Sequence, residues 1–312
     1  MKLAMKLLID RALAGDTQAY SEFQHSYQKL PLNEAEELLN YVNLSTVQLP
    51  VAPNSIEALL VDFATLADRA AQYYDKQNNL EKARQYASMS DAYWDKAIEA
   101  YDSADAHYQK GRRYLRCWSV STVDAHIGLT HIQKAANDFK HSGALYYLGE
   151  VYHLGKYPGE GQNPKKALAY WHKAADANHP ESLYRLARLY QEGYSDILQK
   201  NALTAFEYLK KAAENNHPQA AFSLWVLYKE GVEEIPVAKN QQHATQWLSR
   251  AAQLGDPMGQ YTLGQLYLQQ PNVESKQQAL VLLQQAAKQG VEAASELLAT
   301  VMDNNTIRRP MQ

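Results

Sequence analysis

Histidine is the residue type in this chain best suited to acid–base or metal chemistry, and the spacing of the histidines favours neither. The 312-residue sequence has ten histidines and one cysteine, Cys117. His126 and His131 are five positions apart, about 500° around a helix, so their side chains point to different sides. The sequence has no HExxH motif, no glycine-rich phosphate loop and no histidine pair with carboxylates at metal-ligand spacing. We therefore expect no catalytic residue, no metal site and no cofactor.

Two further histidines, His179 and His217, occupy equivalent places in two copies of the tripeptide Asn-His-Pro. A metal or anion site between repeated segments is one interpretation of this pair. We favour the other, in which each histidine is a turn or helix-capping residue that was duplicated together with the sequence around it.

Positive charge is most concentrated in one short segment that contains Lys110, Arg112, Arg113 and Arg116. Arg112 and Arg116 share a helical face, which suits a carboxylate or phosphate ligand. The alternative is internal pairing with acidic residues just upstream, namely Asp91, Asp95, Glu99, Asp102 and Asp105, and we favour this pairing. With 31 basic against 34 acidic residues and a formal net charge of −3, nucleic-acid binding is not expected.

The elements that position these residues follow from a recurring phrase: ALYYLGEVYHLG at 144–155, SLYRLARLYQEG at 182–193, AAFSLWVLYKEG at 220–231 and GQYTLGQLYL at 259–268. In each copy a small residue is followed four positions later by leucine and eight positions later by tyrosine, which places the three on one helical stripe. A second phrase with a double alanine follows each copy, at Ala174/Ala175, Ala212/Ala213, Ala251/Ala252 and Ala286/Ala287. We therefore predict one helical hairpin per repeat, with Pro180, Pro218 and Pro257 in first helical turns.

This two-phrase unit resembles the Sel-1-like repeat, a relative of the tetratricopeptide repeat, over about residues 144–303. The residues that follow the family pattern most closely are Leu148, Gly149, Tyr152, Gly155, Ala167, Trp171, Ala174 and Ala175. The resemblance implies an all-α fold, a right-handed α/α superhelical solenoid of helical hairpins. We expect a divergent N-terminal region of tetratricopeptide-like hairpins at 1–103, a Sel-1-like array at 104–303 and a disordered tail at 304–312.

By analogy with tetratricopeptide repeats, the third, seventh and tenth positions of the first phrase line the concave surface. A degenerate copy of the first phrase, ADAHYQKGRRYLRCW at 104–118, adds one more set of these positions. We call these positions the first-helix face, and its candidate partner-binding residues are Tyr108, Arg112, Tyr146, Glu150, His153, Tyr184, Arg188, Gln191, Phe222, Val226, Lys229, Tyr261 and Gln265. These residues differ from copy to copy, whereas the packing stripe hardly changes. The aromatic residues at the third position have a second interpretation, as packing between successive first helices.

Stacked hairpins present an extended surface and no deep pocket, which favours a non-enzymatic module that binds a protein or peptide partner. The resemblance implies an adaptor, a regulator or an immunity protein that neutralises a toxin, with a toxin or secretion-system component as partner. One alternative is a small-molecule binder or enzyme, as in cysteine-rich secreted relatives that recognise cell-wall or β-lactam compounds. Another is a homodimerisation scaffold, so both a monomer and a homodimer stay open.

The expected compartment is the cytoplasm, without a membrane anchor. One cysteine excludes an intramolecular disulfide framework. Near the N-terminus, Asp10 and Arg11 limit the apolar run to Leu7, Leu8 and Ile9, which is too short for the apolar segment of a signal peptide.

Overall fold

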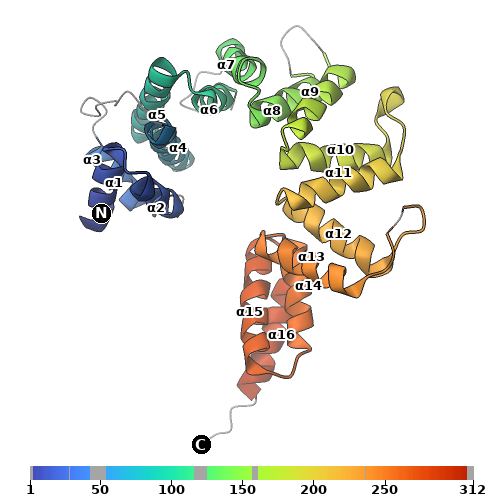
Figure 1. Cartoon of the computed structure of the whole chain (residues 1–312). Helices are drawn as coiled ribbons and strands as arrows, with labels where there is room; N and C mark the ends of the chain where they lie inside the picture. The colour runs from blue at the N-terminus through green and yellow to red at the C-terminus, as the bar shows by residue number, and fades with distance from the viewer. Residues whose placement is uncertain are drawn as a thin grey trace, which may run out of the picture. The chain divides into compact units, whose positions relative to one another are not determined.

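The computed structural model describes residues 3–27, 29–42, 54–115, 125–156, 161–235 and 237–307, and in these ranges the chain is all-α, as predicted. The helices are α1 (Leu3–Leu13), α2 (Thr17–Tyr27), α3 (Leu32–Tyr41), α4 (Asn54–Lys76), α5 (Leu80–Tyr101), α6 (Ala104–Tyr114), α7 (Ala125–Asn137), α8 (Ser142–His153), α9 (Pro164–Asp176), α10 (Pro180–Glu192), α11 (Ala202–Glu214), α12 (Pro218–Glu230), α13 (Gln241–Gln253), α14 (Pro257–Leu268), α15 (Val273–Lys288) and α16 (Glu292–Ile307) (Figure 1). The handedness of the superhelix stays a prediction.

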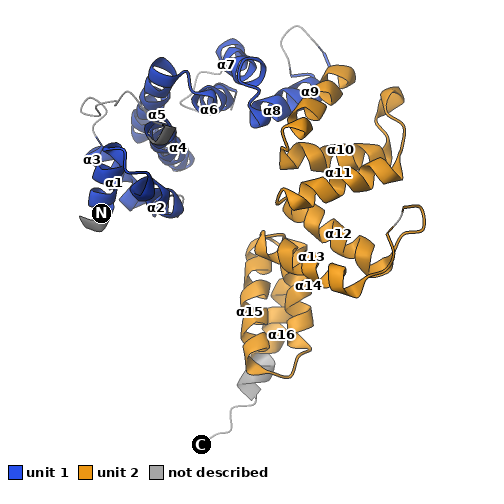
Figure 2. Ribbon diagram, viewed as in Figure 1, with its two compact units in different colours: residues 1–162 blue, residues 163–312 orange. Residues whose placement is uncertain are grey.

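The chain divides into two compact units (Figure 2). Unit 1 covers residues 1–162 and holds α1 to α8, and unit 2 covers residues 163–312 and holds α9 to α16. The predicted boundary at 103/104 falls at the turn between α5 and α6 and stays a prediction. Of the predicted disordered tail, residues 304–307 continue α16, and residues 308–312 lie outside the described residues.

The same turn precedes several of the hairpins. Each residue of the Asn-His-Pro tripeptide has its own role in this turn. Asn178 and Asn216 have φ of 57° and 67°, a left-handed conformation that asparagine tolerates well and that ends the preceding helix. The following histidine is the N-cap, and the proline occupies the first helical turn, where no N–H is needed. Gly255, Asp256 and Pro257 repeat the same geometry with other residues.

In the packing stripe predicted from the repeated phrase, the small residue and the leucine are buried in all four copies, whereas the tyrosine is buried at Tyr152 and half-buried at Tyr190, Tyr228 and Tyr267. Leu148, Leu186 and Leu224 are fully buried, and the small residues Ala144, Ser182, Ala220 and Gly259 are buried beside them. The double alanines of the second helices are buried too, except that Ala287 is only partly buried. At Gly259 an added Cβ would lie 2.9 Å from the Cβ of Ala251, so a side chain here would force the helices apart. The prediction of small residues at close helix contacts is confirmed.

The core of unit 1 differs from the repeats because its central helices, α4 and α5, are much longer. Phe23 of α2 packs edge-on against Phe63 of α4, with ring centroids 5.7 Å apart, and the tilted ring of Tyr93 on α5 lies at the same separation from Phe63. Trp94, also on α5, is almost completely buried. The N-terminal third therefore adds large aromatic side chains to a core of leucine and alanine, whereas the described buried apolar residues of α10 to α16 are leucine and alanine.

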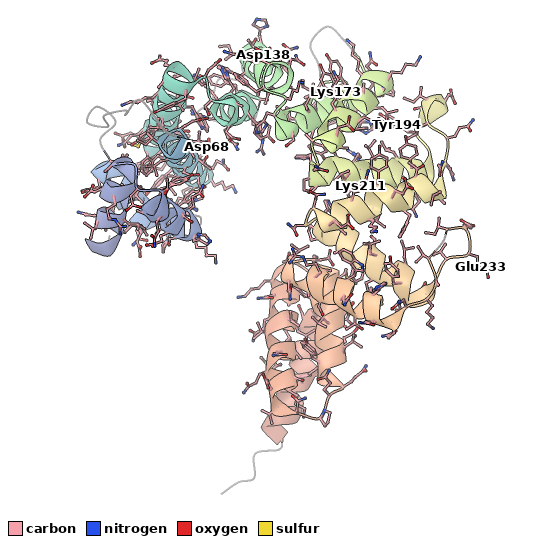
Figure 3. The ribbon with its side chains drawn as sticks, viewed as in Figure 1. Asp68, Asp138, Lys173, Tyr194, Lys211 and Glu233 are labelled. Atoms are coloured by element: carbon pink, nitrogen blue, oxygen red, sulfur yellow. The ribbon has the colours of Figure 1, made fainter. Side chains whose placement is uncertain are left out.

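In unit 2 the first helix of a hairpin leads into a structured loop. We call residues 193–201 the first loop and 231–240 the second loop; both project from the helices, as Tyr194 and Glu233 show in Figure 3. Isolated antiparallel bridges close them, between Tyr194 and Leu198 and between Val232 and Val237. Each loop begins with a glycine at positive φ, 83° at Gly193 and 73° at Gly231.

Candidate functional site

The aromatic residues at the third position of the first helices pack onto the hairpin that follows. The Tyr108 ring lies 4.6 Å from the ring of His141, the N-cap of α8, and the Tyr184 ring lies 4.2 Å from His217, the N-cap of α12. Phe222 and Tyr261 pack against the apolar clusters around Leu248 and Leu283. These rings therefore have a packing role, and partner contact through their exposed edges stays a prediction.

Two capping histidines, His141 and His217, also join two repeats through the second ring nitrogen. Nδ1 of His217 accepts the backbone N–H of Ala220 at 3.2 Å, so the proton of the neutral ring sits on Nε2, which donates to Oε2 of Glu181 at 3.2 Å. His141 repeats the pattern between Ala144 and Asp105, at 3.1 and 2.8 Å. These hydrogen bonds hold the pKa of both carboxyls below its usual range.

The capping interpretation of His179 and His217 is therefore confirmed. Nδ1 of His179 accepts from the Ser182 N–H at 3.3 Å, and His217 is 2% exposed. His141 belongs to the same series but precedes serine instead of proline, which is why the tripeptide search missed it. Its position 38 residues before His179 was the available signal.

The remaining predicted partner-binding residues divide by exposure. Three of them are exposed, namely Arg188, Gln191 and Lys229. The others are half-buried, namely Arg112, Tyr146, Glu150, His153, Val226 and Gln265. The guanidinium of Arg188 lies 2.8 Å from Glu192, and Lys229 lies over the Trp225 ring at 5.0 Å. No predicted residue is fully buried, so every one retains some exposed surface.

A pocket of about 340 Å³ opens between α10, α11 and α12 in unit 2. Its walls are largely apolar and come from Tyr184, Ala187, Ala202, Ala205, Phe206, Leu209, Leu227, Val232 and Ile235. Polar and charged side chains complete the lining, namely Arg188, Gln191, Lys200, Ser223 and Glu234. The structure thus brings together Tyr184, Arg188 and Gln191 from the predicted set, and this pocket is the candidate partner site.

Sequence reasoning missed the part of the pocket that α12 and the two loops supply. Ser223 and Leu227 occupy the fourth and eighth positions of their phrase, next to the positions assigned to the first-helix face. Lys200 comes from the first loop, and Glu234 and Ile235 come from the second. The nine- and ten-residue stretches between helices were the available signal, because long ordered loops often carry binding residues.

The basic segment of α6 is an internal ion-pair cluster in the part that the structure describes. Arg113 is 5% exposed, and its Nη1 lies 2.8 Å from Oδ1 of Asp91 and 2.7 Å from the carbonyl oxygen of Ala87. Lys110 is also buried and donates to Asp95. The favoured interpretation is confirmed for these two residues, whereas Arg116 and Cys117 lie outside the described residues.

Two further histidines meet beside that cluster. Nδ1 of His107 lies 2.7 Å from Nδ1 of His131, so one ring must donate and the other accept. Burial lowers the pKa of both rings, to about 4 for His131. His126 is exposed, as expected from its different helical side. Across the described ranges, no group of three or more metal-ligating side chains comes together.

None of the described helices combines the length and the hydropathy needed to cross a membrane.

Comparison with known proteins supports the repeat assignment. A family model described as the Sel1 repeat matches residues 142–179, 180–217, 219–256 and 257–291. A Sel1 repeat protein from Oxalobacter formigenes is 22% identical, with 74% of this chain and 88% of that chain covered and a TM-score of 0.53. A protective antigen of uropathogenic Escherichia coli with an SLR fold is 18% identical, with 97% and 76% covered and a TM-score of 0.50. At these identities the two structures show the fold.

An immunity protein from Pseudomonas aeruginosa is 25% identical, with 61% of this chain and 67% of that chain covered and a TM-score of 0.39. No curated protein matches the chain in sequence.

Proposed function

Residues 142–291 place the chain in the Sel1 repeat family, and on that premise we propose that it is a non-enzymatic interaction module that binds a protein or peptide partner. Sel1 repeat solenoids typically serve protein interactions. The buried stripe of each repeat is occupied by packing, which leaves the first-helix face and the two loops as the variable surface.

The pocket between α10, α11 and α12 is the observation that carries the proposal. At this pocket, residues of the first-helix face line an apolar cavity. In protein interfaces, a few residues in apolar pockets with a polar rim contribute most of the binding free energy. The rim side chains Arg188 and Lys200 are exposed, so a partner reaches them without disturbing the fold.

Within this proposal, the partner is a protein whose activity is controlled or whose assembly is organised by binding. A toxin and a secretion-system component are the two classes implied by the resemblance to Sel-1-like proteins. Cys117 is the only cysteine, so this chain cannot form intramolecular disulfide bonds. This difference from the cysteine-rich secreted relatives disfavours the small-molecule binding that those relatives carry out. Identification of a captured partner by mass spectrometry separates the two classes.

The test is a pull-down from the source cells with the wild-type protein, a pocket variant and a control variant. The pocket variant carries Arg188→Glu and Lys200→Glu, which reverse two exposed charges at the rim. The control carries Lys276→Glu and Lys288→Glu, which make the same charge change on α15, away from the pocket. Equal melting temperatures verify that all three proteins are folded.

The proposal expects a partner that is retained by the wild type and the control and is lost from the pocket variant. Retention of the same partners by all three proteins would contradict binding at this pocket. Loss from both variants would show a nonspecific dependence on charge and would also contradict it.

A further inference from the structure

The pocket has an apolar interior, and its rim carries a basic side chain from the first loop, Lys200, and an acidic side chain from the second loop, Glu234. We propose that it receives one apolar side chain of a partner segment in which an acidic residue stands on one side of that side chain and a basic residue on the other. This inference rests on the proposed function and specifies the chemistry of the partner at the same site.

The interior sets the first part of the specification. Leu209 and Leu227 are half-buried, Ile235 is buried, and together with Phe206 they leave apolar surface that water covers in the free protein. A volume of about 340 Å³ is at the small end of ligand sites, which span about 300–1,000 Å³. The cavity therefore fits an anchoring side chain with its neighbouring backbone and is too small for a whole helix.

The rim sets the second part. Lys200, from the first loop, is exposed and has no ion pair among the described residues, so its ammonium is available to a carboxylate. Arg188, from α10, also lines the pocket but already binds Glu192 at 2.8 Å. Glu234, from the second loop, is exposed and likewise without an ion pair in the described part of the chain. Lys200 therefore faces the acidic residue of the partner, and Glu234 faces the basic one.

The two loops that carry these charges are held in place before a partner arrives. In the first loop, the N–H of Tyr194 donates to Leu198 at 2.9 Å, and the N–H of Asn201 donates to Tyr190 at 2.7 Å. In the second, the N–H of Val232 donates to Val237 at 3.0 Å, and the loop is closed onto α12 through Tyr228. Because both loops are already ordered, binding of a partner costs this protein little conformational entropy. The charges on the loops are therefore fixed in place before binding and can select the order of charges in the partner segment.

Selection of random twelve-residue peptides displayed on phage tests the inference directly. One target is the wild type, and the other carries Lys200→Glu together with Glu234→Lys, which exchanges the two charges while the net charge stays the same. Peptides selected on the wild type should share an apolar residue with an acidic residue on one side and a basic residue on the other. Peptides selected on the exchanged variant should share the opposite order.

Fluorescence anisotropy with one synthetic peptide of each order then gives the size of the effect. Each peptide should bind its own target about tenfold more tightly than the other target, because two rim contacts change from attraction to repulsion. A third protein, Leu227→Arg, should bind neither peptide, since the guanidinium occupies the apolar interior.

Selection of the same peptides by both targets, or of peptides with no common charge order, would overturn the inference. Failure to select any peptide on the wild type would overturn it as well. The pull-down tests the proposed function independently of these results. Loss of the partner from the Arg188→Glu, Lys200→Glu variant would still support the proposed function.

Discussion

Arg113 is a single residue that joins three helices of unit 1. From α6 it reaches Asp91 and the carbonyl of Ala87 on α5, and its Nε lies 3.8 Å from Asp68 on α4, which Figure 3 labels. Burial raises the pKa of Asp91, although Arg113 acts in the opposite direction. The guanidinium therefore places a positive charge beside two carboxyl groups that are largely removed from water.

Replacing Arg113 with methionine should lower the free energy of unfolding by about 3–5 kcal/mol, because it leaves Asp68 and Asp91 without their cation. Arg112→Met is the matched control, since Arg112 is half-exposed and contacts only Tyr108 and Gln109 among the described residues. Urea unfolding followed by circular dichroism measures both. Equal effects of the two substitutions would contradict the internal-cluster account.

His217 combines a cap, a hydrogen bond between repeats and a stacked ring. The substitution His217→Ala removes all three and should cost about 1–3 kcal/mol. His217→Asn keeps a side-chain cap but loses the stacking on Tyr184, so its unfolding free energy should lie between those of the alanine variant and the wild type. An alanine variant as stable as the wild type would show that the cap and the stack contribute nothing.

The pair His107 and His131 makes the stability of unit 1 depend on pH. Because burial lowers the folded-state pKa of His131 from 6.5 to about 4, the unfolded chain binds the proton more tightly than the folded chain. The stability from the neutral ring is complete above pH 6.5 and is lost as the pH falls toward 4. The charged groups around the pair are Lys110, Lys134, Asp95 and Asp102.

His131→Gln should therefore flatten the decline of the unfolding free energy between pH 7 and pH 5 relative to the wild type, as measured by urea titrations at matched ionic strength. Carboxyl groups contribute equally to both proteins in this range, so the difference isolates the ring. Parallel curves for the two proteins would contradict a buried neutral histidine.

At the scale of elements, the second helices depend on alanine where they meet the next hairpin. Ala212 of α11 is completely buried, and its carbonyl accepts the N–H of His217 at 3.0 Å. Ala212→Leu should overpack this junction and cost about 1–3 kcal/mol. Glu207→Leu, an exposed position on the same helix, should change the melting temperature little. If both variants melt like the wild type, the close approach of the two hairpins is not required.

Element by element, the sequence predicts what local periodicity controls. A single helix or turn sets the spacing of its own residues, so features with such a spacing can be predicted from the sequence. These features are the leucine stripe, the double alanines and the turn tripeptides. The pocket was not predictable in full, because Leu227 and Glu234 approach Tyr184 only after two hairpins stack. In the N-terminal third, α4 and α5 follow no repeated phrase, so their packing through Phe63 and Trp94 left no periodic signal.

At the scale of the whole molecule, the two compact units build their cores differently. In unit 1 the core around α4 and α5 includes large aromatic side chains beside leucine and alanine, whereas the described buried apolar residues of α10 to α16 in unit 2 are leucine and alanine. In unit 2 each hairpin contacts its neighbours. Each part of the surface available to a partner is therefore formed by adjacent hairpins. Under the proposed function, partner choice depends on few residues, and the pocket between α10 and α12 brings together Tyr184, Arg188 and Gln191 of the predicted set.

Hydrogen–deuterium exchange of the full chain with and without its captured partner tests that central claim most directly. Binding at the pocket predicts slower exchange in α10, in the first turns of α11, and in the second loop around residues 231–235, with α1 to α5 unchanged. Protection confined to α1 to α5, with α10, α11 and the second loop exchanging as in the free protein, would contradict the account.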